Sequence, residues 1–94
     1  MLQISVGAND EIVLSGRFDA AEAEKARKVF LNLNDARVVD FAQLDYISSA
    51  GLGVLLAAQK KLSEEGKSLR LINVKGHIRD VFHFSGFDQI FEIV

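Results

Sequence analysis

The sequence of 94 residues contains no cysteine and no proline. The absence of cysteine excludes disulfide bonds and thiolate metal sites, and it leads us to expect a protein of the cytoplasm. The sequence has no low-complexity tract and no proline- or serine-rich segment, so nothing in it indicates an interdomain linker. A chain of this length can build one hydrophobic core, so we expect a single domain over residues 1–94.

Long apolar runs and an excess of positive charge are also absent. No stretch reaches the roughly 18 apolar residues of a membrane-spanning helix, so we expect no direct insertion into a membrane. The N-terminus, "MLQISVGANDEIVLSG", lacks a basic region followed by a long apolar stretch and does not match a signal peptide. The 11 basic residues against 13 acidic ones give a net charge of -2, which provides no basic surface for nucleic acid.

The sequence does contain alternating strand and helix patterns. Residues 2–6 alternate apolar and polar side chains, and a second apolar run starts at residue 12, so we predict a β-hairpin closed by the turn at residues 7–10. An amphipathic helix follows, with Ala23, Ala26 and Phe30 on its apolar stripe. Asp19 and Glu22 precede this stripe with the spacing of a capping box, and we predict that they cap the helix.

The second half of the chain continues this alternation. Residues 37–41 and 68–74 have the pattern of strands, and the final "QIFEIV" predicts a short strand or an extended tail. Two helices are predicted between these segments. The first follows "LDYISSAG", has an inner stripe of leucines and ends at Gly66, and the second lies in "HIRDVFHFSG" and ends at Gly86. Their apolar stripes are Leu52, Leu55, Leu56 and Leu62 in the first, and Ile78, Val81 and Phe82 in the second.

The predicted order is β-β-α-β-α-β-α, with a short last strand or tail. Strand–helix–strand units favour parallel pairing, so we expect the α/β class, with a mixed, mostly parallel sheet packed with helices. Ligands and partners of such folds bind where loops leave the carboxyl ends of the parallel strands. "SGRFDA" and "LDYISSAG" are both such loops and both lead into a helix, so the candidate site lies there.

Signals for enzymatic chemistry are weak. His77 and His83 are six residues apart on one predicted helix, and no third metal ligand accompanies them. No serine lies in a nucleophile elbow, and the glycine patterns of dinucleotide and P-loop sites are incomplete. Asp19, Asp40 and Asp45 would gather near the strand ends, but caps and loop polarity explain them more simply than acid–base catalysis. We therefore expect no enzyme, no catalytic residue, no metal and no cofactor.

Two adjacent serines, Ser48 and Ser49, stand at the start of the central helix. One of them is expected to be its N-cap, which contributes about 1 kcal/mol, and the sequence does not decide which. The free amides and dipole of a helix N-terminus also stabilise an anion. A phosphoserine here would keep the fold and would present a charge of about -1.5 to -2 to a partner packed on Gly51 and Leu52. Bound and free states would then switch without refolding.

The segment "VVDFAQLDYISSAGLGVLLAAQKKL", together with "SGRFDA" and "VFHFSGFDQIFEI", resembles the STAS domain of the bacterial anti-sigma factor antagonist family. The resemblance covers nearly the whole chain, and "ISSAGLGVLL" is its most specific part. It implies a STAS-like fold and a regulatory binding protein rather than an enzyme.

The resemblance also implies a mechanism, partner switching. In that family the unphosphorylated antagonist binds an anti-sigma factor that is also a serine kinase, and this frees the sigma factor. The kinase phosphorylates the serine of an Asp-Ser-[Ser/Thr]-Gly motif, which breaks the complex, and a PP2C-type phosphatase restores the antagonist. Carried onto this chain, the phosphoacceptor is Ser49, with Ser48 as the lesser candidate. The implied partner surface consists of Asp19, Ser48, Ser49, Ala50, Gly51 and Leu52.

The chain departs from the family motif at two positions. Ser48 stands where the family has aspartate, and Ala50 stands where it has a second serine or threonine. The first change removes a charge beside the acceptor and leaves open which kinase recognises the loop. An alternative is therefore a STAS interaction module of a transporter-associated or signalling complex, in which the serines only cap the helix. A nucleotide or small-molecule binder is disfavoured by the lack of a phosphate-cradling glycine pattern, and the oligomeric state is not predicted.

Overall fold

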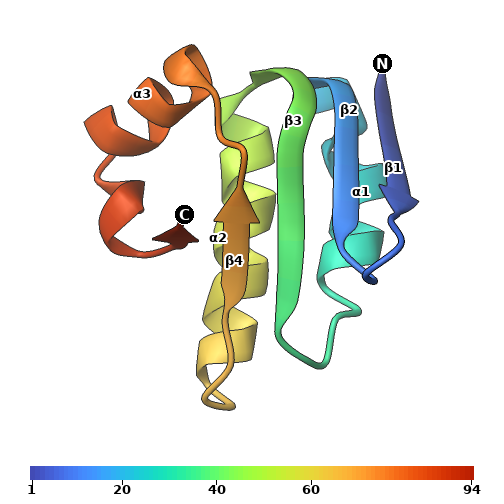
Figure 1. Cartoon of the computed structure of the whole chain (residues 1–94), viewed down its shortest axis with the longest axis vertical. Coiled ribbons are helices and arrows are strands. Elements are labelled where there is room, and N and C mark those ends of the chain that lie inside the picture. The colour runs from blue at the N-terminus through green and yellow to red at the C-terminus, as the bar shows by residue number, and fades with distance from the viewer.

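Five strands form one sheet in the order in which they occur along the chain, and the computed structural model describes all residues from 1 to 94 (Figure 1). β1 is antiparallel to β2, whereas β2 to β5 are mutually parallel. The strands are β1 (Leu2–Val6), β2 (Ile12–Phe18), β3 (Arg37–Ile47), β4 (Leu69–Ile72) and β5 (Glu92–Ile93). The predicted α/β class and the mixed, mostly parallel sheet are confirmed, and the C-terminal segment ends in a short strand.

Helices connect the parallel strands. They are α1 (Ala23–Phe30), α2 (Ser49–Ser63) and α3 (Gly76–Phe84), with short 3-10 turns at η1 (Ala20–Glu22) and η2 (Phe87–Gln89). In Figure 1, α1 and α2 lie behind the sheet and α3 lies beside β4. The predicted terminators of α2 and α3 both adopt positive φ, +74° at Gly66 and +76° at Gly86, a conformation that glycine adopts without a steric penalty.

The core lies between the sheet and the helices. The leucines Leu52, Leu55 and Leu62 of α2 are buried as predicted, and Leu56 is only half-buried. Aromatic rings attach α3 to this core, because the ring centroid of Phe82 lies 6.0 Å from that of Phe41 and 5.5 Å from that of Phe91, both edge to face. The helix that follows β4 is therefore fixed to the sheet by ring packing.

β3 is longer than the sequence pattern predicts. It was expected over residues 37–41, followed by a loop, but it continues to Ile47 and only Ser48 separates it from α2. The register between β2 and β3 shifts twice, between Val13 and Ser15 and again between Gly16 and Arg17. Since β3 carries the extra residues at these bulges, its inward side chains lose the period of two that marks a strand in a sequence.

The sheet face opposite α1 and α2 carries exposed side chains, among them Gln3, Arg17, Gln43 and Arg70. None of the helices combines the length and the apolar character needed to cross a bilayer.

Candidate functional site

The carboxyl ends of β2 and β3 bring two of the candidate residues together. Phe18 and Ile47 are register partners at the ends of these strands, and the backbone N–H of Ser48 donates to the carbonyl of Phe18 at 2.9 Å. Asp19 and Ser48 follow these partners directly, so they lie side by side at the edge of the sheet. The chain then enters α2 at Ser49.

Ser48 is the N-cap of α2. Its backbone is extended, with φ -91° and ψ 172°, and its Oγ accepts the N–H of Gly51 at 3.1 Å. Its carbonyl accepts the N–H of Leu52 at 2.9 Å and so closes the first turn. The choice between the two serines, which the sequence leaves open, therefore falls on Ser48.

Ser49 has a different environment. It is the first residue of α2 and is exposed, and its hydroxyl takes no part in the capping bond. Ala50 and Gly53 are exposed too. Gly53 lies four residues after Ser49 and three after Ala50, so it neighbours both of them on this side of the helix. We refer to Asp19, Ser48, Ser49, Ala50 and Gly53 as the α2 N-terminal surface.

Gly51 and Leu52 do not lie on this surface. Leu52 is 6% exposed, and Gly51 is buried. A Cβ atom on Gly51 would lie 3.0 Å from side-chain carbons of both Phe18 and Ile47, so the missing side chain lets α2 approach the sheet closely. Both residues support the first turn from inside, and the expected contact of a partner with Gly51 and Leu52 stays a prediction.

Asp19 does not form the predicted capping box. Its carboxylate makes no capping bond at η1, and its Oδ1 is buried without a hydrogen-bond partner. Glu22 does not reach back to Asp19 either: its Oε1 accepts the N–H of Leu2 at 3.2 Å, and Lys25 Nζ donates to the carbonyl of Leu2. This prediction was wrong because Glu22 pairs with the start of β1. Beside the N-terminus of α2 there remains a carboxylate oxygen whose desolvation is not compensated within the chain.

The other candidate side chains do not gather into a catalytic or metal site. His77 Nε2 lies 2.8 Å from the carbonyl oxygen of Asp45, a contact that ties the start of α3 to β3, and His83 Nδ1 pairs with Asp88 at 2.9 Å. Asp40 accepts from the side-chain amide of Asn73 and from a backbone N–H near by, so it is engaged within the sheet. No group of three or more possible metal ligands occurs in the structure.

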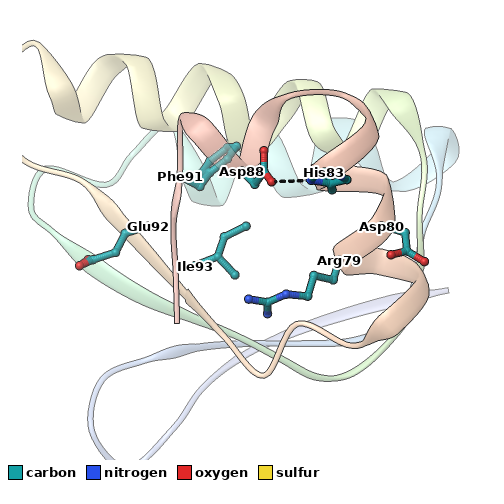
Figure 2. Close-up of a pocket in the computed structure, with 7 residues that line it drawn as sticks. All are labelled: Arg79, Asp80, His83, Asp88, Phe91, Glu92 and Ile93. Carbon is teal, nitrogen blue, oxygen red and sulfur yellow. Dashed lines mark hydrogen bonds and ion pairs between the residues drawn. The ribbon is translucent and has the colours of Figure 1, made fainter.

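The largest cavity lies elsewhere. It has a volume of about 560 Å³ and lies between α3 and the C-terminal segment, where Figure 2 shows the His83–Asp88 pair at its rim. A second cavity of about 290 Å³ lies at Arg37, Ser68 and Arg70. Neither is lined by a residue of the α2 N-terminal surface. That surface is therefore exposed rather than enclosed, which suits a protein partner better than a buried small molecule.

One feature of the site was missed from the sequence. The guanidinium carbon of Arg17 lies 4.3 Å from the centroid of the Tyr46 ring, and the two residues are register partners on β2 and β3. They stand two positions before Asp19 and Ser48, so a parallel alignment of the two strands would have placed them together.

Comparison with known proteins identifies the family of the chain. The family model described as "Mlab, STAS domain" matches residues 3–94. The chain is 43% identical over 83 residues to the "Putative anti-sigma factor antagonist BtrV" of Bordetella bronchiseptica, covering 87% of this chain and 70% of that protein. It is 28% identical over 87 residues to the "Anti-sigma-B factor antagonist" of Listeria monocytogenes, covering 88% of this chain and 76% of that one.

The fold is shared with the Bacillus protein SpoIIAA, an anti-sigma factor antagonist. Its unphosphorylated form superimposes with a TM-score of 0.70 at 19% identity, covering 96% of this chain and 97% of that one. Its phosphorylated form gives a TM-score of 0.70 at 21% identity, covering 100% and 91%. The chain therefore belongs to the STAS-domain family. Within that family it belongs with the bacterial anti-sigma factor antagonists, as the resemblance in "ISSAGLGVLL" predicts.

Proposed function

We propose that this protein is an anti-sigma factor antagonist that acts by partner switching. Its unphosphorylated form binds an anti-sigma factor that is also a serine kinase, through the α2 N-terminal surface, and this frees the sigma factor. The kinase then transfers the γ-phosphoryl group of ATP to Ser49 Oγ. An O–P bond forms, ADP leaves and the hydroxyl proton is released. A PP2C-type phosphatase hydrolyses the phosphoserine, and the whole cycle takes place in the cytoplasm.

The observation that carries this proposal is the division of labour between the two serines. Ser48 Oγ is occupied by the N–H of Gly51, whereas the Ser49 hydroxyl is exposed at the start of a helix of 15 residues. The Ser48 hydroxyl is half-buried and engaged in the capping bond, so it is less accessible to a kinase than the Ser49 hydroxyl. A phosphate on Ser49 would leave that cap in place and would face the positive end of the helix dipole.

The same geometry supports release of the partner. A phosphate adds a charge of about -1.5 to -2 to a surface that otherwise presents small side chains at Ala50 and Gly53. A partner that has excluded water from these residues would face an uncompensated charge, and Asp19 beside it has the same sign. Like charges brought together in a desolvated interface cost several kcal/mol, and a loss of about 4 kcal/mol weakens a micromolar complex to a millimolar one.

Relatives support the proposal by their names and forms. The relatives from Bordetella bronchiseptica and Listeria monocytogenes are named as anti-sigma factor antagonists, and the shared fold has been solved for SpoIIAA in a phosphorylated form. The alternative is a STAS interaction module of another complex without a phosphoswitch. The specific observation in its favour is the loss of the acidic residue and of the second hydroxyl at Ser48 and Ala50.

Phosphorylation of the purified protein separates the two candidates. We would incubate the wild type with each anti-sigma serine kinase of the source genome and ATP, and map the phosphate by mass spectrometry. The proposal predicts one phosphate on Ser49 and none in Ser49→Ala, while Ser48→Ala is still modified. A phosphate on Ser48 alone, or efficient modification of Ser49→Ala, contradicts the assignment. No binding and no modification with any kinase favours the alternative module.

A further inference from the structure

Arg17 and Tyr46 form an exposed pair on the open face of the sheet. The guanidinium of Arg17 stacks over the Tyr46 ring at 4.3 Å, Arg17 is exposed, and Tyr46 is 37% exposed. Side chains alternate between the two faces of a strand, and the next residues, Phe18 and Ile47, are buried. The pair therefore points away from the core, towards solvent.

Arg17 also differs from most arginines of the chain. Arg27, Arg37 and Arg70 each lie within 4.0 Å of a carboxylate, at Glu24, Asp10 and Glu92 respectively. No ion pair of this kind involves Arg17, although Asp19 is only two residues further along the chain. Stacking on the ring restrains the guanidinium and leaves its N–H edge free. A restrained, planar guanidinium loses little conformational entropy when it donates two hydrogen bonds to a carboxylate in a bidentate pair.

The pair is continuous with the α2 N-terminal surface. Arg17 and Tyr46 are register partners, their successors Phe18 and Ile47 are paired in turn, and Asp19 and Ser48 follow at the edge of the sheet. A partner that covers Ser49 and extends over this edge would meet the Arg17–Tyr46 pair next. Tyrosine and arginine are the side chains most often found as energetic centres of protein interfaces.

From this arrangement we infer that the Arg17–Tyr46 pair is a second contact site for the anti-sigma partner, and that it receives an aspartate or glutamate side chain of that partner. The inference rests on the proposed function and extends it. The partner surface then includes the open face of the sheet near the carboxyl ends of β2 and β3, as well as the start of α2. Ser48 supplies no charge, so Arg17 adds a positive group beside Asp19 to the local electrostatic selection of a partner.

Affinity measurements on the full chain test this inference. Dissociation constants would be measured by calorimetry against a purified anti-sigma kinase that binds the wild type. We expect Arg17→Ala to weaken binding about 10-fold to 100-fold and Arg17→Glu to weaken it further, because the partner's carboxylate loses its counter-charge. Arg17→Lys keeps the charge but loses the fork, and is expected to lie between Arg17→Ala and the wild type. Tyr46→Phe keeps the ring and should bind like the wild type, whereas Tyr46→Ala should not.

Arg79 provides the matched control. It is an exposed arginine without an ion pair, but it lines the cavity beside α3 rather than the edge that carries Ser49 (Figure 2). Arg79→Glu changes the net charge by the same amount as Arg17→Glu. Because Arg79 lies away from the proposed partner surface, this variant is expected to bind within about twofold of the wild type. Circular dichroism melting of each variant would verify that the fold is retained. We expect it to be retained because both arginines lie on the surface.

A charge swap identifies the partner's group. Acidic surface residues of the kinase would be changed to arginine one at a time, and one such change should restore the binding of Arg17→Glu. The inference is overturned if Arg17→Glu binds like the wild type, if Arg79→Glu weakens binding equally, or if no acidic position restores it. If at the same time Ser49→Glu releases the partner, the proposed function stands without this contact. If the wild type binds no anti-sigma kinase, both fall together.

Discussion

Replacing Ser48 with alanine should destabilise the protein measurably. The substitution removes the Oγ that accepts the N–H of Gly51 at 3.1 Å. Loss of an N-cap costs about 0.5–2 kcal/mol, and the upper half of this range applies because Gly51 is buried and water cannot replace the lost acceptor. A decrease of about 1–2 kcal/mol in the free energy of unfolding corresponds to a fall in Tm of roughly 5–15 °C for a domain of this size.

Two further variants isolate the capping bond. Ser49→Ala removes an exposed hydroxyl at the first helical position and should change the stability by less than about 0.5 kcal/mol. Ser48→Asp retains a capping oxygen and should stay close to the wild type, because aspartate caps helices as well as serine does. The comparison is thus between two neighbouring serines that differ in one hydrogen bond.

Urea denaturation followed by circular dichroism gives the required numbers. The three variants and the wild type should share one m-value, so that differences in midpoint report differences in stability. The reasoning is refuted if Ser49→Ala loses as much stability as Ser48→Ala, or if Ser48→Ala unfolds at the same urea concentration as the wild type. Either result would mean that Ser48 does not cap α2 in solution.

Further predictions concern the first turn of α2, the sheet edge and the core. Gly51→Ala should be about 1–3 kcal/mol less stable than Gly53→Ala by chemical denaturation, because both gain helix propensity but only Gly51 meets core side chains at 3.0 Å, and equal stabilities would count against this. A hydrogen bond and the charge of Arg70 lower the pKa of Glu92, so the pair's small contribution to stability is present above the unfolded-state pKa and is lost as pH falls through the lower folded-state pKa. Arg70→Ala should raise the pKa of Glu92 towards its ordinary value in an NMR titration, and an unchanged titration would contradict the pairing. Gln59→Leu should cost about 1–3 kcal/mol in thermal melting, because the buried backbone N–H at the start of β4 loses its acceptor, and an unchanged Tm would argue against that bond.

Most of the element order could be predicted from local patterns. The hairpin and the two glycine terminators depend on neighbours within a few residues, and the structure confirms them. The apolar stripes of the helices are buried except for Ala23, Leu56 and Val81, which are half-buried. The length of β3 could not be predicted in this way. Its inward residues Phe41, Leu44 and Ile47 are buried but three positions apart, since the two register shifts against β2 interrupt the alternation. Only the pairing of the two strands reveals the pattern.

The details of the site depended on contacts that are distant in the sequence. Asp19 and Glu22 have the residue types and the spacing of a capping box, but the amide of Leu2 takes the Glu22 carboxylate. The cap of α2 was undecided between two adjacent serines of equal capping propensity. The N–H of Ser48 donates to the carbonyl of Phe18, which holds the backbone of Ser48 in the extended conformation. The helix therefore begins at Ser49. A local pattern therefore located the site, and tertiary contacts assigned its residues.

The central claim is that the charge on Ser49 controls partner binding, and one comparison tests it most directly. The affinity of a purified anti-sigma serine kinase would be measured by calorimetry for the wild type, Ser49→Ala and Ser49→Glu, with Ser48→Asp as a control for charge at the neighbouring position. The account predicts that Ser49→Ala binds like the wild type and that Ser49→Glu binds at least about tenfold more weakly, which corresponds to roughly 1.4 kcal/mol or more. Equal affinities for Ser49→Ala and Ser49→Glu would contradict it.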